Sequence, residues 1–234
     1  MLKVAVIGAG SVGLSFLSAV LIAAQFLASG EDYFVKEVWV WMAIGEFTPG
    51  FNFYLDGLSL VMMLIITGVG FLIHLYSTGF MVDDPAYSRF FAYMNLFAFA
   101  MLMLVLGDSL LLTFLGWEGV GACSYLLISF WFTDEANASA GKKAFITNRI
   151  GDWGFMLAIF MTFATFGTVA YVDVLDTTAA GTVATSTATF IALMLFVGAI
   201  GKSAQFPLFL WLPDAMAGPT PVSALIHAAT MVTS

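Results

Sequence analysis

Five ionisable side chains lie within otherwise apolar stretches of this sequence, and they are the residues best suited to chemistry. They are Glu118, Arg149, Asp152, Lys202 and His227. Carboxylates, lysine and histidine can take up and release protons, so the set is typical of a proton or ion path. A charge at the centre of a bilayer costs at least about 2.5–3.5 kcal/mol on insertion scales, so each charge needs a reason. No metal-ligand spacing such as H-E-x-x-H is present, and we expect this chain to hold no metal and no cofactor.

The three charges nearest the middle of the chain lie in two short motifs. Glu118 belongs to Gly116-Trp-Glu-Gly-Val-Gly121, whose glycines leave room for a neighbouring helix, water or a counter-charge. Arg149 and Asp152 are three residues apart, on one face of a helix, where they can form an ion pair. Glu118 could instead be a protonated carboxyl in a packing groove, and the pair could serve only to neutralise charge during insertion.

The strongest candidate site is Lys202, which is followed five residues later by Pro207. Proline lacks an N–H and crowds the carbonyl of Ser203, so the helix should kink or break beside the lysine. A broken helix at membrane depth must be packed in protein or line a cavity. His227 could relay protons or be a hydrogen-bonded core histidine, and His74 is interpreted as structural.

The composition shows which elements must position these residues. Of 234 residues, 61% are hydrophobic and only 9% are charged, whereas soluble domains carry about 25% charged residues. This excludes a soluble enzyme and a disordered chain. A net charge of -8 excludes a nucleic-acid partner, because neutralising phosphates needs clustered Lys and Arg. Cys123 is the one cysteine and permits no internal disulfide. The predicted fold class is an all-α polytopic membrane protein, a helical bundle with one helix broken near Lys202–Pro207.

The apolar stretches predict six complete transmembrane helices and a partial seventh in a single membrane domain, 1–234, because a span needs about 20 mostly apolar residues. The predicted spans are 4–28, 58–80, 90–106, 109–132, 144–167, 187–212 and 219–234. Since the seventh span ends while still apolar, we interpret the chain as a fragment of a longer protein. Alternating residue types predict a short strand at 34–42.

The loop charges predict how the helices are oriented. One membrane face receives Lys3, Arg89, Lys142 and Lys143, and the other receives only Lys36. The positive-inside rule therefore places the first group in the cytoplasm or its equivalent.

The glycines near the N-terminus permit a competing interpretation. Gly8, Gly10 and Gly13 match the G-x-G-x-x-G fingerprint of dinucleotide-binding proteins, which requires a preceding strand and a following helix. No charged residue occurs between Val4 and Gly30, and small residues also allow close helix packing in lipid. A nicotinamide-nucleotide-binding oxidoreductase remains an unfavoured alternative.

Three long motifs make the chain resemble a known family. They are Gly116-Trp-Glu-Gly-Val-Gly-Ala-Cys-Ser-Tyr-Leu-Leu-Ile128, Ala144-Phe-Ile-Thr-Asn-Arg-Ile-Gly-Asp152 and Met216-Ala-Gly-Pro-Thr-Pro-Val-Ser-Ala-Leu-Ile-His-Ala-Ala-Thr-Met-Val232. The sequence closely resembles the antiporter-like subunits L (subunit 5 in mitochondria) of respiratory complex I, NADH:quinone oxidoreductase. The resemblance covers nearly the whole chain, although the family's first helix and C-terminal half are absent. Sodium/proton antiporter subunits share several of these elements and are the alternative.

The resemblance implies a role for each candidate residue. Lys202 would be a pump lysine on a broken helix, Glu118 the partner that modulates it, and His227 a relay toward a second lysine. Asp152 with Arg149 would couple the chain to an adjacent antiporter-like subunit. The chain would be a translocase subunit without a redox centre, and NADH, flavin, iron-sulfur clusters and quinone would be bound by partner subunits. Its partners would be complex I membrane subunits, lipid and protons, in a bacterial inner membrane or alternatively a mitochondrial one. The fragment alone should not pump.

Overall fold

Long apolar helices make up most of the chain, as a computed structural model describes it for residues 1–45, 48–229 and 231–232. Five of the described helices are long and apolar enough to cross a membrane. They are α1 (Leu2–Ser29), α2 (Gly57–Phe80), α3 (Tyr87–Leu106), α4 (Leu110–Ile128) and α7 (Thr185–Lys202). The predicted fold class, a helical polytopic membrane protein, is confirmed.

Helix α5 (Glu135–Phe166) differs most from its predicted range of 144–167. It begins nine residues earlier, where Asp134 caps it by accepting a hydrogen bond from the Ala136 N–H. Its first turns are polar, so a hydropathy criterion detects only the apolar remainder. The same polar turns and the Arg149–Asp152 pair lower the mean hydropathy of α5. For this reason α5 is not one of the five helices named above.

Helix α7 ends at Lys202, so the span predicted at 187–212 is interrupted, and the break expected near Lys202–Pro207 is present. The chain continues through Ala204, which has a left-handed φ of 49°, into the short 3-10 helices η1 (Phe209–Trp211) and η2 (Asp214–Ala217). Pro207 explains the break, because its ring would clash with the carbonyl four residues earlier in a continuing helix.

The partial seventh span is also shorter than a transmembrane helix in the part that the structure describes. It consists of α8 (Thr220–Ala224) followed by a π-helical turn, η3 (Leu225–Ala229). Residues 230 and 233–234 of the predicted range lie outside the described residues.

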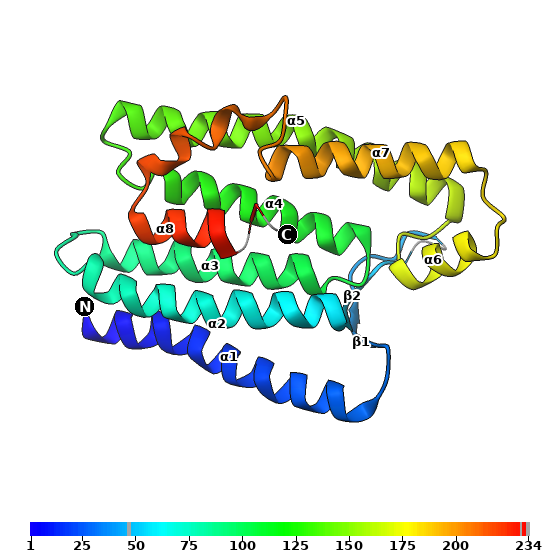
Figure 1. Cartoon of the computed structure of the whole chain (residues 1–234), viewed down its shortest axis with the longest axis horizontal. Helices are drawn as coiled ribbons and strands as arrows, with labels where there is room; N and C mark the ends of the chain where they lie inside the picture. Colours follow the sequence, from blue (N-terminus) through cyan, green and yellow to red (C-terminus); the bar gives the residue numbers. More distant parts are fainter. Residues whose placement is uncertain (46–47, 230, 233–234) are drawn as a thin grey trace.

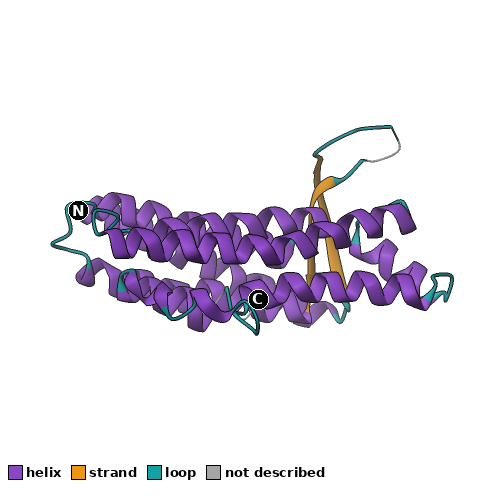
Figure 2. Cartoon of the chain, turned by 90° about the horizontal axis from the view of Figure 1, so that it is seen from above, coloured by secondary structure: helices purple, strands orange, loops and turns teal. Residues whose placement is uncertain are grey.

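The long helices pack in chain order, from α1 through α2, α3 and α4 to α5, and α7 returns along α5 (Figure 1). Helix α3 lies in the centre of this order and supplies the core. Phe90, Met94, Phe97 and Met101 are all fully buried on it. Seen from above, the helices run nearly parallel to one another (Figure 2).

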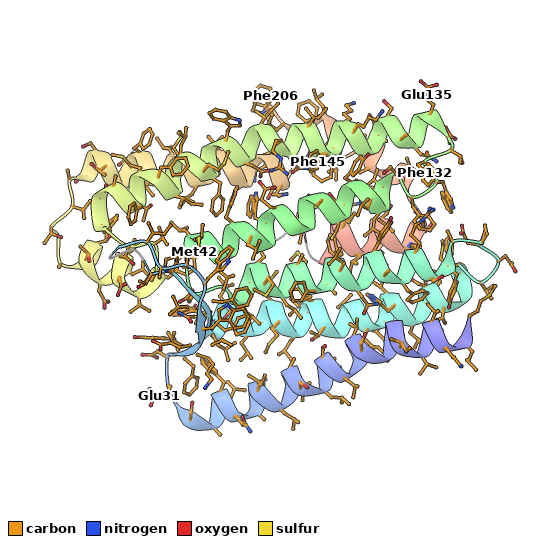
Figure 3. The ribbon with its side chains drawn as sticks, turned by 180° about the vertical axis from the view of Figure 1, so that it is seen from behind. Glu31, Met42, Phe132, Glu135, Phe145 and Phe206 are labelled. Carbon is orange, nitrogen blue, oxygen red and sulfur yellow. The ribbon has the colours of Figure 1, made fainter. Side chains whose placement is uncertain are left out.

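A two-stranded sheet and the short helix α6 (Tyr171–Ala179) lie at one end of the bundle (Figure 1). Strands β1 (Tyr33–Val40) and β2 (Gly50–Asp56) pair antiparallel, so the strand predicted at 34–42 is present and its partner was missed. The hairpin crosses the helices, and residues 41–45 and 48–49 between its strands lie beyond them (Figure 2). Glu31 and Met42 mark this end, whereas Phe132 and Glu135 mark the opposite end (Figure 3).

The N-terminal glycines do not form a nucleotide-binding turn. Helix α1 begins at Leu2, so no strand precedes Gly8, and the fingerprint loses the context it requires. A Cβ placed at Gly13 would lie 2.9 Å from the ring of Phe71, and one at Gly8 would meet the ring of Phe91. These two glycines therefore let α1 pack closely against α2 and α3, and the nicotinamide-nucleotide interpretation is wrong.

Candidate functional site

The candidate site lies where α7 ends against the middle of α5 (Figure 1). Glycines set the distance between the two helices. A Cβ at Gly151 would lie 3.0 Å from the Gly201 Cα, and one at Gly154 would lie 2.7 Å from the Val197 Cβ. The contact between Gly151 and Gly201 brings the residues that follow them, Asp152 and Lys202, onto touching turns of two helices.

Lys202 is almost fully enclosed, with 1% of its surface exposed. Its ammonium lies 5.6 Å from the centre of the Trp117 ring, within cation–π range. Gly121 leaves space for it, because a Cβ there would lie 2.8 Å from Nζ. Among the described residues, Nζ has no hydrogen-bond partner. A buried ammonium without a paired anion is costly, so Lys202 stays the strongest candidate residue of the site.

Arg149 connects the two acidic candidates. Its guanidinium contacts the Glu118 carboxylate, and its Nε lies 3.7 Å from Asp152 Oδ2. The i, i+3 pairing of Arg149 with Asp152 expected from the sequence is therefore present. The Phe145 ring, labelled in Figure 3, lies 4.6 Å from the guanidinium carbon and covers one of its faces. Glu118, the expected partner of Lys202, forms its ion pair with Arg149.

Trp117 is a member of the site that the sequence analysis missed. Its indole Nε1 donates a hydrogen bond of 2.6 Å to Asp152 Oδ1, and both side chains are buried. Its position immediately before Glu118 was the available signal, because a buried tryptophan N–H needs an acceptor. The site thus comprises one lysine, one arginine, two carboxylates and an indole.

His227 is connected to the residue before the lysine through Trp211. It lies in the π-helical turn η3, and its ring is 6.3 Å from the ring of Trp211. Trp211 donates a hydrogen bond of 3.0 Å to the Gly201 carbonyl, one residue before Lys202. His74 lies elsewhere, fully buried on α2, where its Nδ1 bonds the Gly70 carbonyl at 2.7 Å.

A second polar region occurs at the end of the bundle that carries the hairpin. It surrounds a cavity of about 240 Å³ between β2 and the α3–α4 and α5–α6 connections. Burial raises the pKa of Asp108 there, partly opposed by a 3.0 Å hydrogen bond that Asn52 donates to its Oδ2. Burial also raises the pKa of Tyr171 to about 12, although its hydroxyl shares a 2.7 Å hydrogen bond with Thr113.

Within the described residues, no group of three or more His, Cys, Asp or Glu side chains is arranged to hold a metal ion.

Two family descriptions match this chain. Residues 107–234, more than half of it, match the family described as NADH:quinone oxidoreductase/Mrp antiporter, TM. The chain belongs to this family. Residues 41–91 match the family described as NADH-Ubiquinone oxidoreductase (complex I), chain 5 N-terminus. The matched ranges of this antiporter-family chain include all five candidate residues, and the resemblance noted from its motifs is confirmed.

Named relatives of this antiporter-family chain are subunits of one kind of complex. It is 52% identical over 231 residues to NADH-quinone oxidoreductase subunit L of Escherichia coli (strain K12), covering 98% of this chain and 38% of the relative. It is 51% identical over 236 residues to subunit L of Pseudomonas aeruginosa, covering 98% and 38%. It is also 46% identical to NADH-ubiquinone oxidoreductase chain 5 of Triticum aestivum, over 92% of this chain and 33% of the relative. The chain therefore spans about two fifths of these relatives or less.

A solved structure supports the same family fold. The Mrp complex from Dietzia sp. DQ12-45-1b contains a chain that aligns with 99% of this one, with a TM-score of 0.80 and 27% identity, and the match covers 26% of that chain.

Proposed function

We propose that this chain forms part of a proton-translocating membrane subunit of NADH:quinone oxidoreductase in a bacterial inner membrane. The observation that carries the proposal is the ammonium of Lys202, which is buried where α7 meets α5 and has no hydrogen-bond partner among the described residues. A lysine in such a position can exchange a proton when a nearby charge moves. The names and identities of the relatives support the assignment to this oxidoreductase.

The proposed mechanism is a change of partner by Glu118. Arg149 holds this carboxylate in the present arrangement. If Glu118 turned from Arg149 toward Lys202, its distance from the ammonium would shorten. A change between about 8 and about 4 Å alters the Coulomb energy by about 2 kcal/mol at an effective dielectric constant of about 20. That energy corresponds to about thirtyfold in proton affinity, enough to switch the lysine between holding and releasing its proton.

The other candidate residues take the remaining steps of this proposal. His227 would accept the proton leaving Lys202 and pass it toward further groups of the complete subunit. Asp152 and Arg149 would respond to a charge change in an adjacent antiporter-like subunit, because Arg149 contacts both carboxylates. Redox chemistry would take place in partner subunits that bind NADH, flavin, iron-sulfur clusters and quinone. This chain would contribute proton movement only.

The test is Lys202→Ala in the complete subunit, within the assembled oxidoreductase reconstituted in vesicles. We expect a lower proton-to-electron stoichiometry, while NADH:quinone electron transfer persists in part. Glu118→Gln should give a similar but milder loss, because the lysine remains. An unchanged stoichiometry in the Lys202→Ala enzyme would refute the assignment.

A second candidate function is a sodium/proton antiporter subunit. It is favoured by the fold shared with a chain of the Mrp complex. Sodium-dependent proton movement in vesicles without NADH would support this alternative. Proton movement that requires NADH and is independent of sodium would exclude it.

A further inference from the structure

Trp117 contacts both an anion and a cation of the candidate site. Its indole N–H donates to Asp152 Oδ1 at 2.6 Å, while its ring centre lies 5.6 Å from the ammonium of Lys202. Only 6% of the tryptophan is exposed. One side chain therefore provides a donor for the carboxylate and a π face for the ammonium.

The backbone brings Asp152 and Lys202 close together, where α5 and α7 touch. Each residue directly follows one of the two glycines, Gly151 and Gly201, at which α5 and α7 touch. Both side chains are about 1% exposed. Oppositely charged groups at such depth attract each other strongly. In the structure, however, they do not form an ion pair within 4.0 Å. Among the described residues, the one ion-pair contact of Asp152 is with Arg149.

The hydrogen bond from Trp117 accounts for this separation. Asp152 directs Oδ1 to the indole N–H and has Oδ2 on the side of Arg149. Both oxygens thus have partners other than the lysine. A hydrogen bond to an ionised carboxylate is about twice as strong as one between neutral groups, so it can hold the carboxylate in this orientation.

Trp117 is itself held rigidly. The ring of Phe155, on the same helix as Asp152, lies 5.0 Å from its ring. The preceding residue, Gly116, packs directly against the backbone of Leu104 on α3. The ring contact and the fixed backbone before Trp117 limit how far the indole can turn away from Asp152.

We propose that Trp117 is a positioning residue that holds the Asp152 carboxylate away from Lys202 and so keeps the lysine ammonium unpaired. This inference rests on the proposed function, since an unpaired lysine matters only if that lysine exchanges protons. Without the indole N–H, Asp152 turns to Lys202 and forms an ion pair that fixes the lysine in its charged form. Proton movement through the lysine then stops, although the helices remain packed.

The test compares Trp117→Phe with Trp117→Tyr in the complete, assembled oxidoreductase. The two replacements differ only by a hydroxyl, so both keep a ring near Lys202, while only tyrosine keeps a donor. Trp153→Phe is the matched control, because Trp153 is 64% exposed and lies one residue after Asp152. We expect Trp117→Phe to lower the proton-to-electron stoichiometry as much as Lys202→Ala does. We expect Trp117→Tyr to lose less and Trp153→Phe to lose nothing.

A structure of the assembled Trp117→Phe enzyme by electron cryo-microscopy supplies a readout that loss of packing alone would not change. We expect the Asp152 carboxylate within about 4 Å of the Lys202 ammonium, the usual limit for an ion pair. Reduced pumping without this ion pair would overturn the inference, as would equal pumping by the Phe and Tyr variants. If the Trp117→Phe variant does not assemble, the Trp117→Tyr variant decides the question. The inference is overturned if the assembled Tyr variant pumps no better than Lys202→Ala, and it is supported if the Tyr variant pumps better. Normal pumping by the Lys202→Ala enzyme refutes the proposed function itself. If Lys202→Ala abolishes pumping but Trp117→Phe pumps normally, only this inference is refuted.

Discussion

Gly151→Ala should force α5 and α7 apart at the candidate site. The new Cβ would lie 3.0 Å from the Gly201 Cα and 3.2 Å from the carbonyl oxygens of Val197 and Gly198. All three are backbone atoms that cannot rotate away, and carbon atoms normally approach to about 3.5–4.0 Å. The helices must therefore separate by about 0.5–1 Å. Such overpacking costs about 1–3 kcal/mol, partly offset by the gain of about 1 kcal/mol in helix propensity from glycine to alanine.

The matched control is Gly10→Ala, because a Cβ at Gly10 meets no atom within 4 Å. It gains the same propensity without the clash, so the free energy of unfolding should be about 1–3 kcal/mol lower in Gly151→Ala than in Gly10→Ala. Unfolding in mixed micelles, followed by circular dichroism, measures this difference. Equal unfolding free energies in the two variants would refute the reasoning that backbone contact at Gly151 sets the distance between the helices.

Three further predictions concern other parts of the chain. Gly121→Ala should lower pumping in the complete enzyme, because its Cβ would lie 2.8 Å from Lys202 Nζ; Gly119→Ala, whose Cβ would meet the Ala100 side chain at 2.9 Å, is the control. Because burial raises the pKa of Asp108, the folded chain binds the carboxyl proton more tightly than the unfolded chain does. The free energy of unfolding should therefore fall as the pH rises from about 4 toward neutrality. Thermal denaturation of Asp108→Asn should show a smaller fall in stability over the same pH range. Lys143→Ala should change the free energy of unfolding by less than about 1 kcal/mol, because the 2.6 Å Lys143–Asp214 pair is nearly half exposed; a larger loss in a denaturant titration would contradict this.

The break in α7 could be predicted from the sequence, and the partner of Glu118 could not. Pro207 has a local steric effect, so its position alone predicts that the helix ends near Lys202. Which cation reaches Glu118 depends instead on the rotation of α4 relative to α5 and α7. That rotation is set by contacts between helices, such as Gly121 of α4 against Lys202 Nζ of α7, which no single helix reveals.

The role of the glycines near Lys202 shows the same limit. Glycine lowers helix propensity, so the sequence alone predicts that Gly198 and Gly201 loosen α7. In the structure they are contact points for α5, and a Cβ at Gly201 would lie 3.2 Å from the Gly151 Cα. Likewise, α6 escaped prediction because its nine residues are too few for a span.

The position at which α7 stops has an electrostatic consequence. The peptide dipoles of a helix place about half a negative charge at its C-terminus, and Lys202 is the last residue of α7. Part of the counter-charge for the ammonium therefore comes from the peptide groups themselves. No side-chain substitution removes that part, so a variant without Glu118 still keeps a negative potential around the lysine.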